Sequence, residues 1–172
     1  RAENIDKHFG ITHALDNVSF TFNKGEIHAL IGENGSGKST LTSCLTGIYQ
    51  KDSGKFILEG KEITATNQVE ANHQGVAIIV QEIGTLSGLT VAENIFLGNE
   101  DQFTKYGIKN TAAMNKKAQE YLDSYGFNYI DATKVIDDYN FEDRKLVEIV
   151  KSTYFNPKVL VVDETTTALG QK

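Results

Sequence analysis

Residues 32–40 read "GENGSGKST" and fit the pattern G-x-x-x-x-G-K-[ST] at Gly32, Gly37, Lys38 and Ser39. Glycines at this spacing let consecutive backbone N–H groups turn inward around a phosphate, and a following helix adds its positive N-terminal end. A lysine in this position reaches the β- and γ-phosphates, and the serine hydroxyl ligates Mg²⁺. The stretch therefore predicts a loop that binds a nucleotide through its phosphates.

The residues on either side of this loop have the expected patterns. The run "EIHALI" (26–31) before it is typical of a strand, and "STLTSCLTGI" (39–48) carries helical spacing. A glycine-rich turn between a strand and a helix, with no ligand, is the alternative. The strand–loop–helix context favours nucleotide binding. The predicted contacts are Gly32, Glu33, Asn34, Gly35, Ser36, Gly37, Lys38, Ser39 and Thr40.

A second candidate piece of the site is "VLVVDE" (159–164), an apolar strand that ends in Asp163 and Glu164. An aspartate there holds Mg²⁺ directly or through water, and a neighbouring carboxylate can polarise an attacking water. Two solvated acids at the end of a strand are the alternative. Because the phosphate loop is present, we predict that Asp163 ligates the metal and that Glu164 acts in catalysis.

The rest of the chain indicates an α/β protein. "VAIIV" (76–80) and "VLVVD" (159–163) are continuous apolar runs, typical of buried parallel strands. Between them lies a helical stretch on which Ala113, Lys117, Tyr121 and Leu122 sit near one another. Helical spacing covers residues 90–98, 111–126 and 141–154. We predict a core over about 1–86 and 156–172, with an inserted helical subdomain over about 87–155.

Composition excludes several classes of protein. The 172 residues carry a formal charge of -6 without a basic run, which argues against nucleic-acid binding through phosphate contacts. Cys44 is the single cysteine, so no internal disulfide or cysteine metal cluster is expected. The apolar runs are far too short to span a bilayer. The sequence begins with Arg1 rather than Met, so we expect it to come from a longer chain.

Several further motifs resemble an ATP-binding cassette (ABC) subunit over nearly the whole chain. They are "KHFG…ALDNVSF", "GEIHALIGENGSGKSTL", "LTGIYQKDSG", "VQE" and "LTVAENIFLG". The stretches "GIYQKDSG" and "TVAENIFLG" are similar to the corresponding stretches of bacterial simple-sugar importers of the ribose, galactose and xylose type. The resemblance implies a P-loop NTPase (ABC ATPase) core with a mixed or parallel sheet. It also implies a subunit that binds and hydrolyses Mg-ATP to power sugar import.

The resemblance assigns roles to three more positions. Phe9 resembles the aromatic residue that stacks on adenine; a core phenylalanine after a strand is the alternative. Gln81 resembles the glutamine that ligates Mg²⁺ and couples the site to the permease; a solvated residue at a strand end is the alternative. Glu164 resembles the catalytic base, although Thr165 stands where the family has proline.

The family signature L-S-x-G-Q is missing. Counting back from Asp163 without a gap places it at Tyr139, Asn140, Phe141, Glu142 and Asp143, and "KLVEIVKS" after it still matches. In the family this serine and glycine reach the γ-phosphate held by the other cassette. Like charges about 4 Å apart repel by roughly 4 kcal/mol at an effective dielectric near 20, so Glu142 would hold a phosphate poorly. Asn140 as an N-cap followed by two acids is also a good helix start.

The resemblance further implies a setting on the cytoplasmic face of the cell membrane, as a peripheral subunit. The implied partners are a membrane permease, a second ABC cassette, fused or separate, and indirectly a sugar-binding protein. The family's switch histidine lies after the Asp–Glu pair, whereas His8, His13, His28 and His73 all precede it. We therefore expect the N-terminal part of a longer subunit, which alone hydrolyses ATP hardly above background and tends to self-associate.

Other functions fit less well. A GTPase needs an N-K-x-D motif, and "NKGE" at 23–26 precedes the loop and lacks the aspartate. A small-molecule kinase shares the loop but not "VQE…TVAENIFLG". A regulatory ABC paralogue that binds nucleotide with little turnover, and an ABC ATPase of translation or repair, stay open as alternatives. The sequence does not name the sugar.

Overall fold

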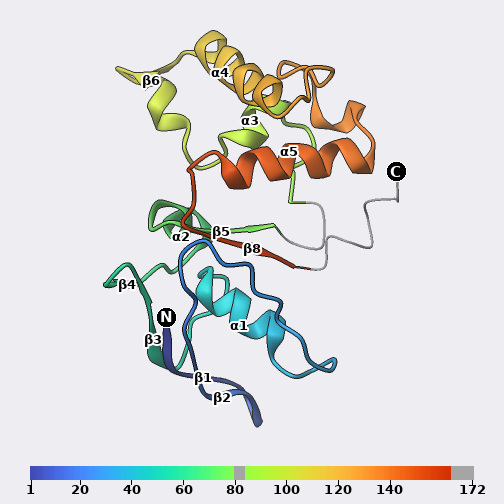
Figure 1. The fold of residues 1–172 in the computed structure, drawn as a ribbon. Coiled ribbons are helices and arrows are strands. Elements are labelled where there is room, and N and C mark those ends of the chain that lie inside the picture. The colour runs from blue at the N-terminus through green and yellow to red at the C-terminus, as the bar shows by residue number, and fades with distance from the viewer. Residues whose placement is uncertain (80–83, 164–172) are drawn as a thin grey trace. The chain divides into compact units, whose positions relative to one another are not determined.

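The structure is a computed structural model that describes residues 1–79 and 84–163 (Figure 1). Its internal contacts divide the chain into two compact units, Arg1–Ala77 and Ile78–Lys172, and each is described by itself. Among the helices of the described residues, none has the length and apolar character needed to cross a membrane.

A four-stranded antiparallel sheet lies in the first unit. Its strands are β1 (Ala2–Phe9), β2 (Thr12–Phe20), β3 (Ser53–Leu58) and β4 (Lys61–Ile63), in the order β2-β1-β3-β4. The cross-strand pairs Ala2↔Phe56 and Phe56↔Ile63 bring buried apolar side chains together on one face. Alternation of apolar and polar residues therefore gives this sheet one buried side.

Gly54 is the position in this sheet that requires glycine. Its φ is 78°, and a side chain there would run into the Asn4 carbonyl of β1. Only glycine takes this left-handed conformation without cost and leaves room for the neighbouring backbone. Gly54 therefore lets β3 approach β1 closely, where the β1–β3 pairing shifts register between Glu3 and Asp6.

Two helices accompany the sheet in the first unit. The helix expected over 39–48 forms as α1 (Lys38–Leu45), and it buries Leu41 and Cys44. Helix α2 (Gln68–His73) begins at Asn67, whose side chain accepts a hydrogen bond from Glu70 N at 2.9 Å. Strand β5 (Val76–Ile79) follows α2.

The strand expected over 26–31 is not formed. Residues of this run have no assigned secondary structure, and Ile27 and Ile31 are 102% and 89% exposed. An apolar run becomes a strand only where another strand pairs with it. In the described residues the sheets are β2-β1-β3-β4, β5-β8 and β6-β7, and none includes this run.

The second unit is mainly helical. Its helices are α3 (Val91–Ile95), α4 (Thr111–Ser124) and α5 (Phe141–Thr153), with 3₁₀ turns η1 (Glu100–Phe103) and η2 (Ile136–Asp138). A short hairpin is made by β6 (Thr104–Lys105) and β7 (Ile108–Lys109), and β8 (Val159–Val162) comes last. The helices expected over 90–98, 111–126 and 141–154 therefore form, each shorter than expected.

These helices enclose one apolar core. Helix α3 starts with a capping box between Thr90 and Glu93. On α4 the buried stripe is Met114, Ala118 and Leu122. The buried core is Val91, Ala92, Ile95, Phe96, Met114, Ala118, Leu122, Ile130, Ala132, Ile136, Val147 and Val150.

Strands β5 and β8 pair beside α5. Asp163 N donates to Ile79 O at 3.0 Å, and Ser152 Oγ of α5 donates to Ile78 O at 3.2 Å. Their arrows run the same way in Figure 1, as a parallel pair would. β5 is buried as expected, but β8 alternates, with Leu160 42% and Val162 55% exposed, because only one of its faces is covered. The helical subdomain boundaries at 87 and 155 stay a prediction.

Candidate nucleotide-binding site

The loop 32–40 turns tightly just before α1 begins. Gly35 and Gly37 have φ of 84° and 88°, the left-handed region that favours glycine. Gly37 caps α1, and a Cβ built on it would lie 2.5 Å from the Ala14 carbonyl oxygen of β2. The glycines therefore set the shape of the loop, and Gly37 also packs it against β2.

Lys38 folds back over the same loop. Its Nζ donates to the carbonyl oxygens of Gly32 at 2.9 Å and of Glu33 at 2.7 Å. A Cβ built on Gly32 would meet Ser36 Oγ at 2.7 Å, a contact that rotation of the serine side chain would relieve. Residues 32–36 and Ser39 are exposed. The arrangement places an ammonium group and the start of a helix beside an open loop, as an anion site requires.

Phe9 lies at the end of β1, in the same unit as the loop. It pairs with Thr12 across the hairpin, and the residue is 43% exposed. The ring contacts the Tyr49 ring edge-on, with centroids 5.2 Å apart. Phe9 is therefore a surface aromatic rather than a core residue, which leaves ring area available for stacking.

The remaining predicted site residues belong to the second unit or lie outside the described residues. Asp163 follows β8, is half-buried and is held by its backbone bond to Ile79. Gln81 and Glu164 lie outside the described residues. Within the first unit, then, the structure brings the phosphate loop, Ser39 and Phe9 together around α1, β1 and β2. The roles assigned to all these residues stay predictions.

A sequence profile of ABC transporters matches residues 15–167, which is most of the chain. The chain belongs to the ABC transporter family. The predicted α/β P-loop fold is confirmed by solved ATP-binding cassettes. One nucleotide-free cassette has a TM-score of 0.78 and 33% identity over 96% of this chain and 68% of its own. Another, in its ADP conformation, has a TM-score of 0.77 and 34% identity over 99% of this chain and 70% of its own.

Two relatives come from the sugar-import branch of the ABC family. The ribose import ATP-binding protein RbsA of Bacillus cereus is 42% identical over 99% of this chain. The arabinose import ATP-binding protein AraG of Vibrio parahaemolyticus is 40% identical over 98% of it. This chain covers 34% of the first protein and 33% of the second. It thus spans about a third of the length of these ABC relatives.

The place of the missing ABC signature is an ordinary helix start, as expected. Asn140 caps α5, and its Oδ1 accepts from Asp143 N at 2.9 Å. Glu142 and Asp143 stand in the first turn, and Tyr129 Oη donates to Asp143 Oδ1 at 3.0 Å. Burial, and then the hydrogen bond to the Asp143 carboxylate, raise the pKa of Tyr129. By the predicted register, these two acids, which the helix dipole favours, stand where the family has glycine and glutamine, and Asn140 stands where it has serine.

The start of α5 is fixed by a second set of contacts. Arg144 donates from Nε to Tyr139 O at 2.9 Å and pairs with Asp137 at 3.3 Å. Asp137 also accepts from Gly88 N at 2.7 Å and Ser87 Oγ at 2.8 Å. These bonds, led by the one from Gly88, hold the pKa of Asp137 below its ordinary value. The substituted signature is therefore well ordered by its neighbours.

Sequence reasoning missed a buried ion pair on α5. Lys145 Nζ and Glu148 Oε2 are 2.9 Å apart, with 3% and 4% of their side chains exposed. Glu148 Oε2 also accepts from Gly84 N at 3.3 Å. A Cβ on Gly84 would lie 2.9 Å from Glu148 Oε1. In the sequence this pair looks like a common surface pair three residues apart, and only the packing of α5 reveals its burial.

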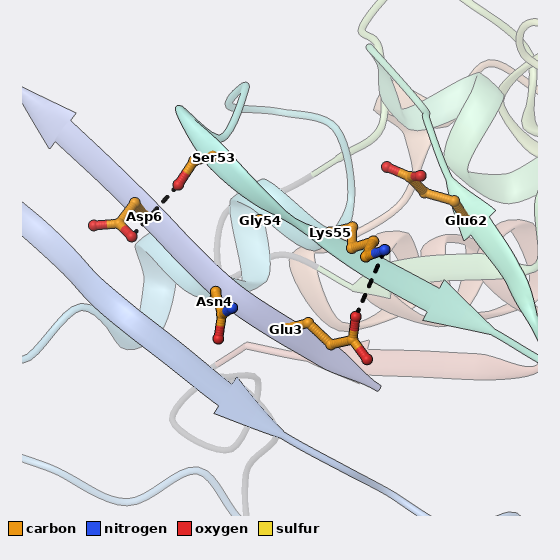
Figure 2. Close-up of a pocket in the computed structure, with 7 residues that line it drawn as sticks. All are labelled: Glu3, Asn4, Asp6, Ser53, Gly54, Lys55 and Glu62. Atoms are coloured by element: carbon orange, nitrogen blue, oxygen red, sulfur yellow. Dashed lines mark hydrogen bonds and ion pairs between the residues drawn. The ribbon is translucent and has the colours of Figure 1, made fainter.

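A polar hollow of about 430 Å³ lies on the sheet of the first unit and belongs to β1, β3 and β4 (Figure 2). Two pairs of its side chains contact each other: Ser53 Oγ donates to Asp6 at 3.4 Å, and Lys55 pairs with Glu3 at 3.9 Å. We assign the hollow no ligand.

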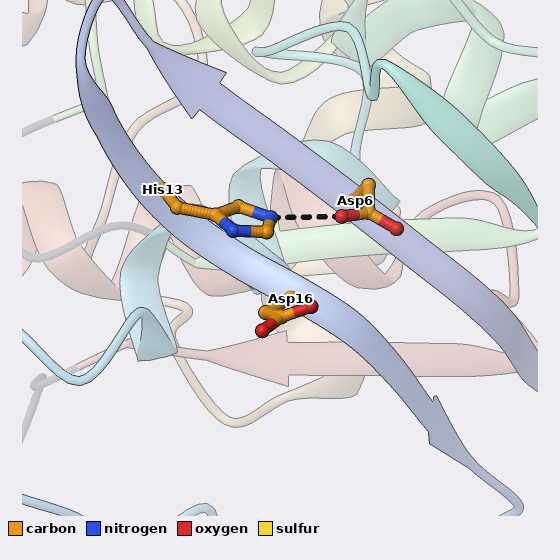
Figure 3. A group of neighbouring side chains, drawn as sticks. All are labelled: Asp6, His13 and Asp16. Carbon is orange, nitrogen blue, oxygen red and sulfur yellow. Dashed lines mark hydrogen bonds and ion pairs between the residues drawn. The ribbon is translucent and has the colours of Figure 1, made fainter.

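A second cluster brings Asp6, His13 and Asp16 together on β1 and β2 (Figure 3). Their nearest ligand atoms lie within 4.8 Å of one another, and His13 Nε2 is 2.8 Å from Asp6 Oδ1. This cross-strand bond is the main reason why the pKa of Asp6 is lowered. His13 and Asp16 are exposed, and such a surface pair is sufficient to explain the arrangement without a metal.

Proposed function

We propose that this chain is the ATP-binding part of an ABC subunit that hydrolyses ATP to power import of a simple sugar. The observation that carries the proposal is the loop 32–40, with Lys38 folded over it at the start of α1. The relatives support it, since those named above are ribose and arabinose import ATP-binding proteins.

The loop would bind the triphosphate of ATP through its backbone N–H groups and Lys38. Lys38 would exchange the carbonyl oxygens of Gly32 and Glu33 for phosphate oxygens, which are stronger partners because they are charged. Phe9 would stack on adenine. Since Phe9 and the loop belong to one unit, the base and the phosphates would be held by a single compact body.

Mg²⁺ fits the donor set predicted here. This hard cation prefers oxygen ligands and keeps several waters. The exposed Ser39 hydroxyl next to Lys38, the Asp163 carboxylate and the Gln81 amide oxygen are such ligands. When bound, the ion would neutralise charge that develops on the phosphates. Glu164 would orient and deprotonate the attacking water as the catalytic base.

The proposed partners are a membrane permease, a second cassette and, through the permease, a sugar-binding protein. The subunit would sit as a peripheral protein on the cytoplasmic face of the membrane. Within such a pair, the start of α5 would face the phosphate held by the other cassette. Glu142 would repel that phosphate, and Asn140 already uses its Oδ1 as the cap of α5. This chain would therefore supply the phosphate loop and the catalytic residues to one ATP site. To the other site it would supply the start of α5, which does not stabilise the phosphate and is called the silent face.

The regulatory alternative, a paralogue that binds nucleotide with little turnover, rests on the lost signature. It is not favoured, because the relatives named above carry import functions in their names. An ABC ATPase of translation or repair is likewise not favoured.

The proposal is tested with the full subunit reconstituted with its permease in vesicles. ATP hydrolysis should rise when the binding protein and its sugar are added, and Glu164→Gln should abolish this rise. The double change Asn140→Ser and Glu142→Gly should leave turnover at this chain's own loop unchanged within about twofold. A tenfold loss from the double change would contradict the silent face, and an unchanged rate in Glu164→Gln would contradict the catalytic role.

A further inference from the structure

The Phe9 ring lies at the surface but contacts two neighbouring side chains. It is the last residue of β1, and Gly10, with φ of 58°, begins the turn to β2. A side chain at a hairpin end, on a residue that is 43% exposed, can adopt several rotamers unless its neighbours fix one. The neighbours of this ring therefore decide whether it is ready to stack on a base.

Tyr49 is the first such neighbour, and α1 fixes its backbone. Tyr49 N donates to Ser43 O of α1 at 3.1 Å, and Ile48 N donates to the same oxygen at 2.9 Å. The Tyr49 ring meets the Phe9 ring at an interplanar angle of 75° and a centroid distance of 5.2 Å. This edge-to-face geometry is one that aromatic pairs prefer. With 44% of Tyr49 also exposed, the two rings form an open corner.

Lys7 is the second neighbour. Its Nζ lies 5.3 Å from the centroid of the Phe9 ring and 3.0 Å from Asp52 Oδ1. Asp52 is itself fixed, because its backbone N donates to Asp6 O at 2.9 Å and its Oδ2 accepts from His8 N at 2.6 Å. The ion pair with Asp52 thus fixes the Lys7 ammonium while it contacts the Phe9 ring. The ring therefore has two neighbours, the Lys7 cation and the Tyr49 ring.

The same helix connects this corner to the phosphate loop. The loop is at the start of α1, and Ser43, which holds Tyr49, is near its end; eight residues of helix span about 12 Å. On the other side, Ala14 of β2 packs against Gly37, and Thr12, the partner of Phe9, lies two residues away, about 7 Å along the strand. Phe9 and the loop are therefore joined by two rigid elements.

We propose that Tyr49 is a positioning residue that holds the Phe9 ring at the distance from the loop that a nucleoside triphosphate needs. The inference rests on the proposed ATP site. Tyr49 would act on the base alone, because its contact is with Phe9, whereas Lys38 and the loop would act on the phosphates.

Two ligands separate these contributions: Mg-ATP, and Mg-tripolyphosphate, which has no base. Titration calorimetry on this chain should show that Tyr49→Ala weakens ATP binding about three- to tenfold, as expected when an aromatic contact that supports base stacking is lost. Tripolyphosphate binding should stay within twofold, which also reports that the loop is still folded. Tyr49→Phe, which keeps the ring, should bind both ligands like the native chain.

Tyr106→Ala is the matched control, because Tyr106 is a 92% exposed tyrosine that also contacts a lysine but lies in the other unit. It should change neither affinity. Equal weakening of both ligands by Tyr49→Ala, or no weakening of either, would overturn the role of Tyr49 while leaving the ATP site intact. A native chain that binds neither ligand would overturn the ATP site itself, and this inference with it.

Discussion

At the scale of single residues, two glycines of the loop 32–40 are required for different reasons. Gly35 and Gly37 share the left-handed conformation, with φ of 84° and 88°. A Cβ on Gly35 would meet nothing within 4 Å, whereas one on Gly37 would collide with the Ala14 carbonyl. The first glycine is thus required by its backbone angle alone, and the second by its angle and by packing against β2.

These two glycines give a matched pair of substitutions. Gly35→Ala should lower the free energy of unfolding by about 1 kcal/mol, the cost of a left-handed alanine. Gly37→Ala should cost about 2–3 kcal/mol, because backbone atoms must also move. Urea unfolding of both variants measures the difference. Equal losses would mean that the approach of Ala14 to Gly37 does not constrain the loop.

The buried pair on α5 gives a second prediction. Glu148→Gln should lower the free energy of unfolding by about 3 kcal/mol, because it removes the carboxylate charge that lies 2.9 Å from the Lys145 ammonium at a buried position. The surface pair Lys117–Glu120 has the same spacing and 45% and 52% exposed side chains. Glu120→Gln should therefore cost less than about 0.5 kcal/mol. Similar losses in the two variants would show that burial does not set the strength of the α5 pair.

At the scale of elements, the sequence predicted the helices better than the strands. Helical spacing and caps are local, so α4 and α5 formed where expected, with Asn140 as the cap. Of the residues that the spacing on α4 grouped together, Leu122 belongs to the buried stripe, whose other members are Met114 and Ala118. Which stripe is buried depends on what the helix packs against, and the spacing alone does not contain this.

The prediction of a strand over residues 26–31 was wrong for a similar reason. Its apolar pattern is that of a strand, but ladder hydrogen bonds come from a partner that is remote in sequence. Within the candidate site, the loop and its glycines could be predicted, because the spacing of the glycines, the lysine and the serine along the chain is what arranges the groups that bind a phosphate. The corner of Phe9, Tyr49 and Lys7 was not, because it joins three segments that only the folded sheet and α1 bring together.

The turn that leads into this run gives a prediction about pH. Glu26 accepts from the side chain and the backbone N of Asn23 and bonds His28, and these bonds lower its pKa to about 2. Because the folded pKa is lowered, these bonds add stability that is complete above the ordinary value of 4.5. This stability is lost as the pH falls toward about 2. Carbon-detected NMR of the Glu26 carboxyl should give a midpoint near 2 in the native chain.

Asn23→Ala is the control for this titration, since it removes the side-chain donor that contributes most to the shift. The midpoint should then move up toward 4.5, the ordinary value. A midpoint that is already near 4.5 in the native chain would contradict the bonded turn described here.

At the scale of the whole molecule, the first unit contains the phosphate loop and the aromatic corner, and the second contains Asp163 and the altered signature. Nucleotide binding is thus expected of the first unit's own residues. By the proposal, metal binding and hydrolysis need groups from both units and from a second cassette. The two activities should therefore respond differently to substitution, and binding is the more direct measure of what this chain does by itself.

The central claim is that residues 32–40 bind Mg-ATP, and calorimetric titration of this chain with Mg-ATP tests it most directly. The native chain should show saturable heat. Lys38→Ala should lose it, because the ammonium that now bonds Gly32 and Glu33 would no longer be available to the phosphates. Lys117→Ala, an exposed lysine on α4 away from the loop in sequence, should bind like the native chain. Saturable heat that is unchanged in Lys38→Ala, or absent from the native chain, would contradict the account.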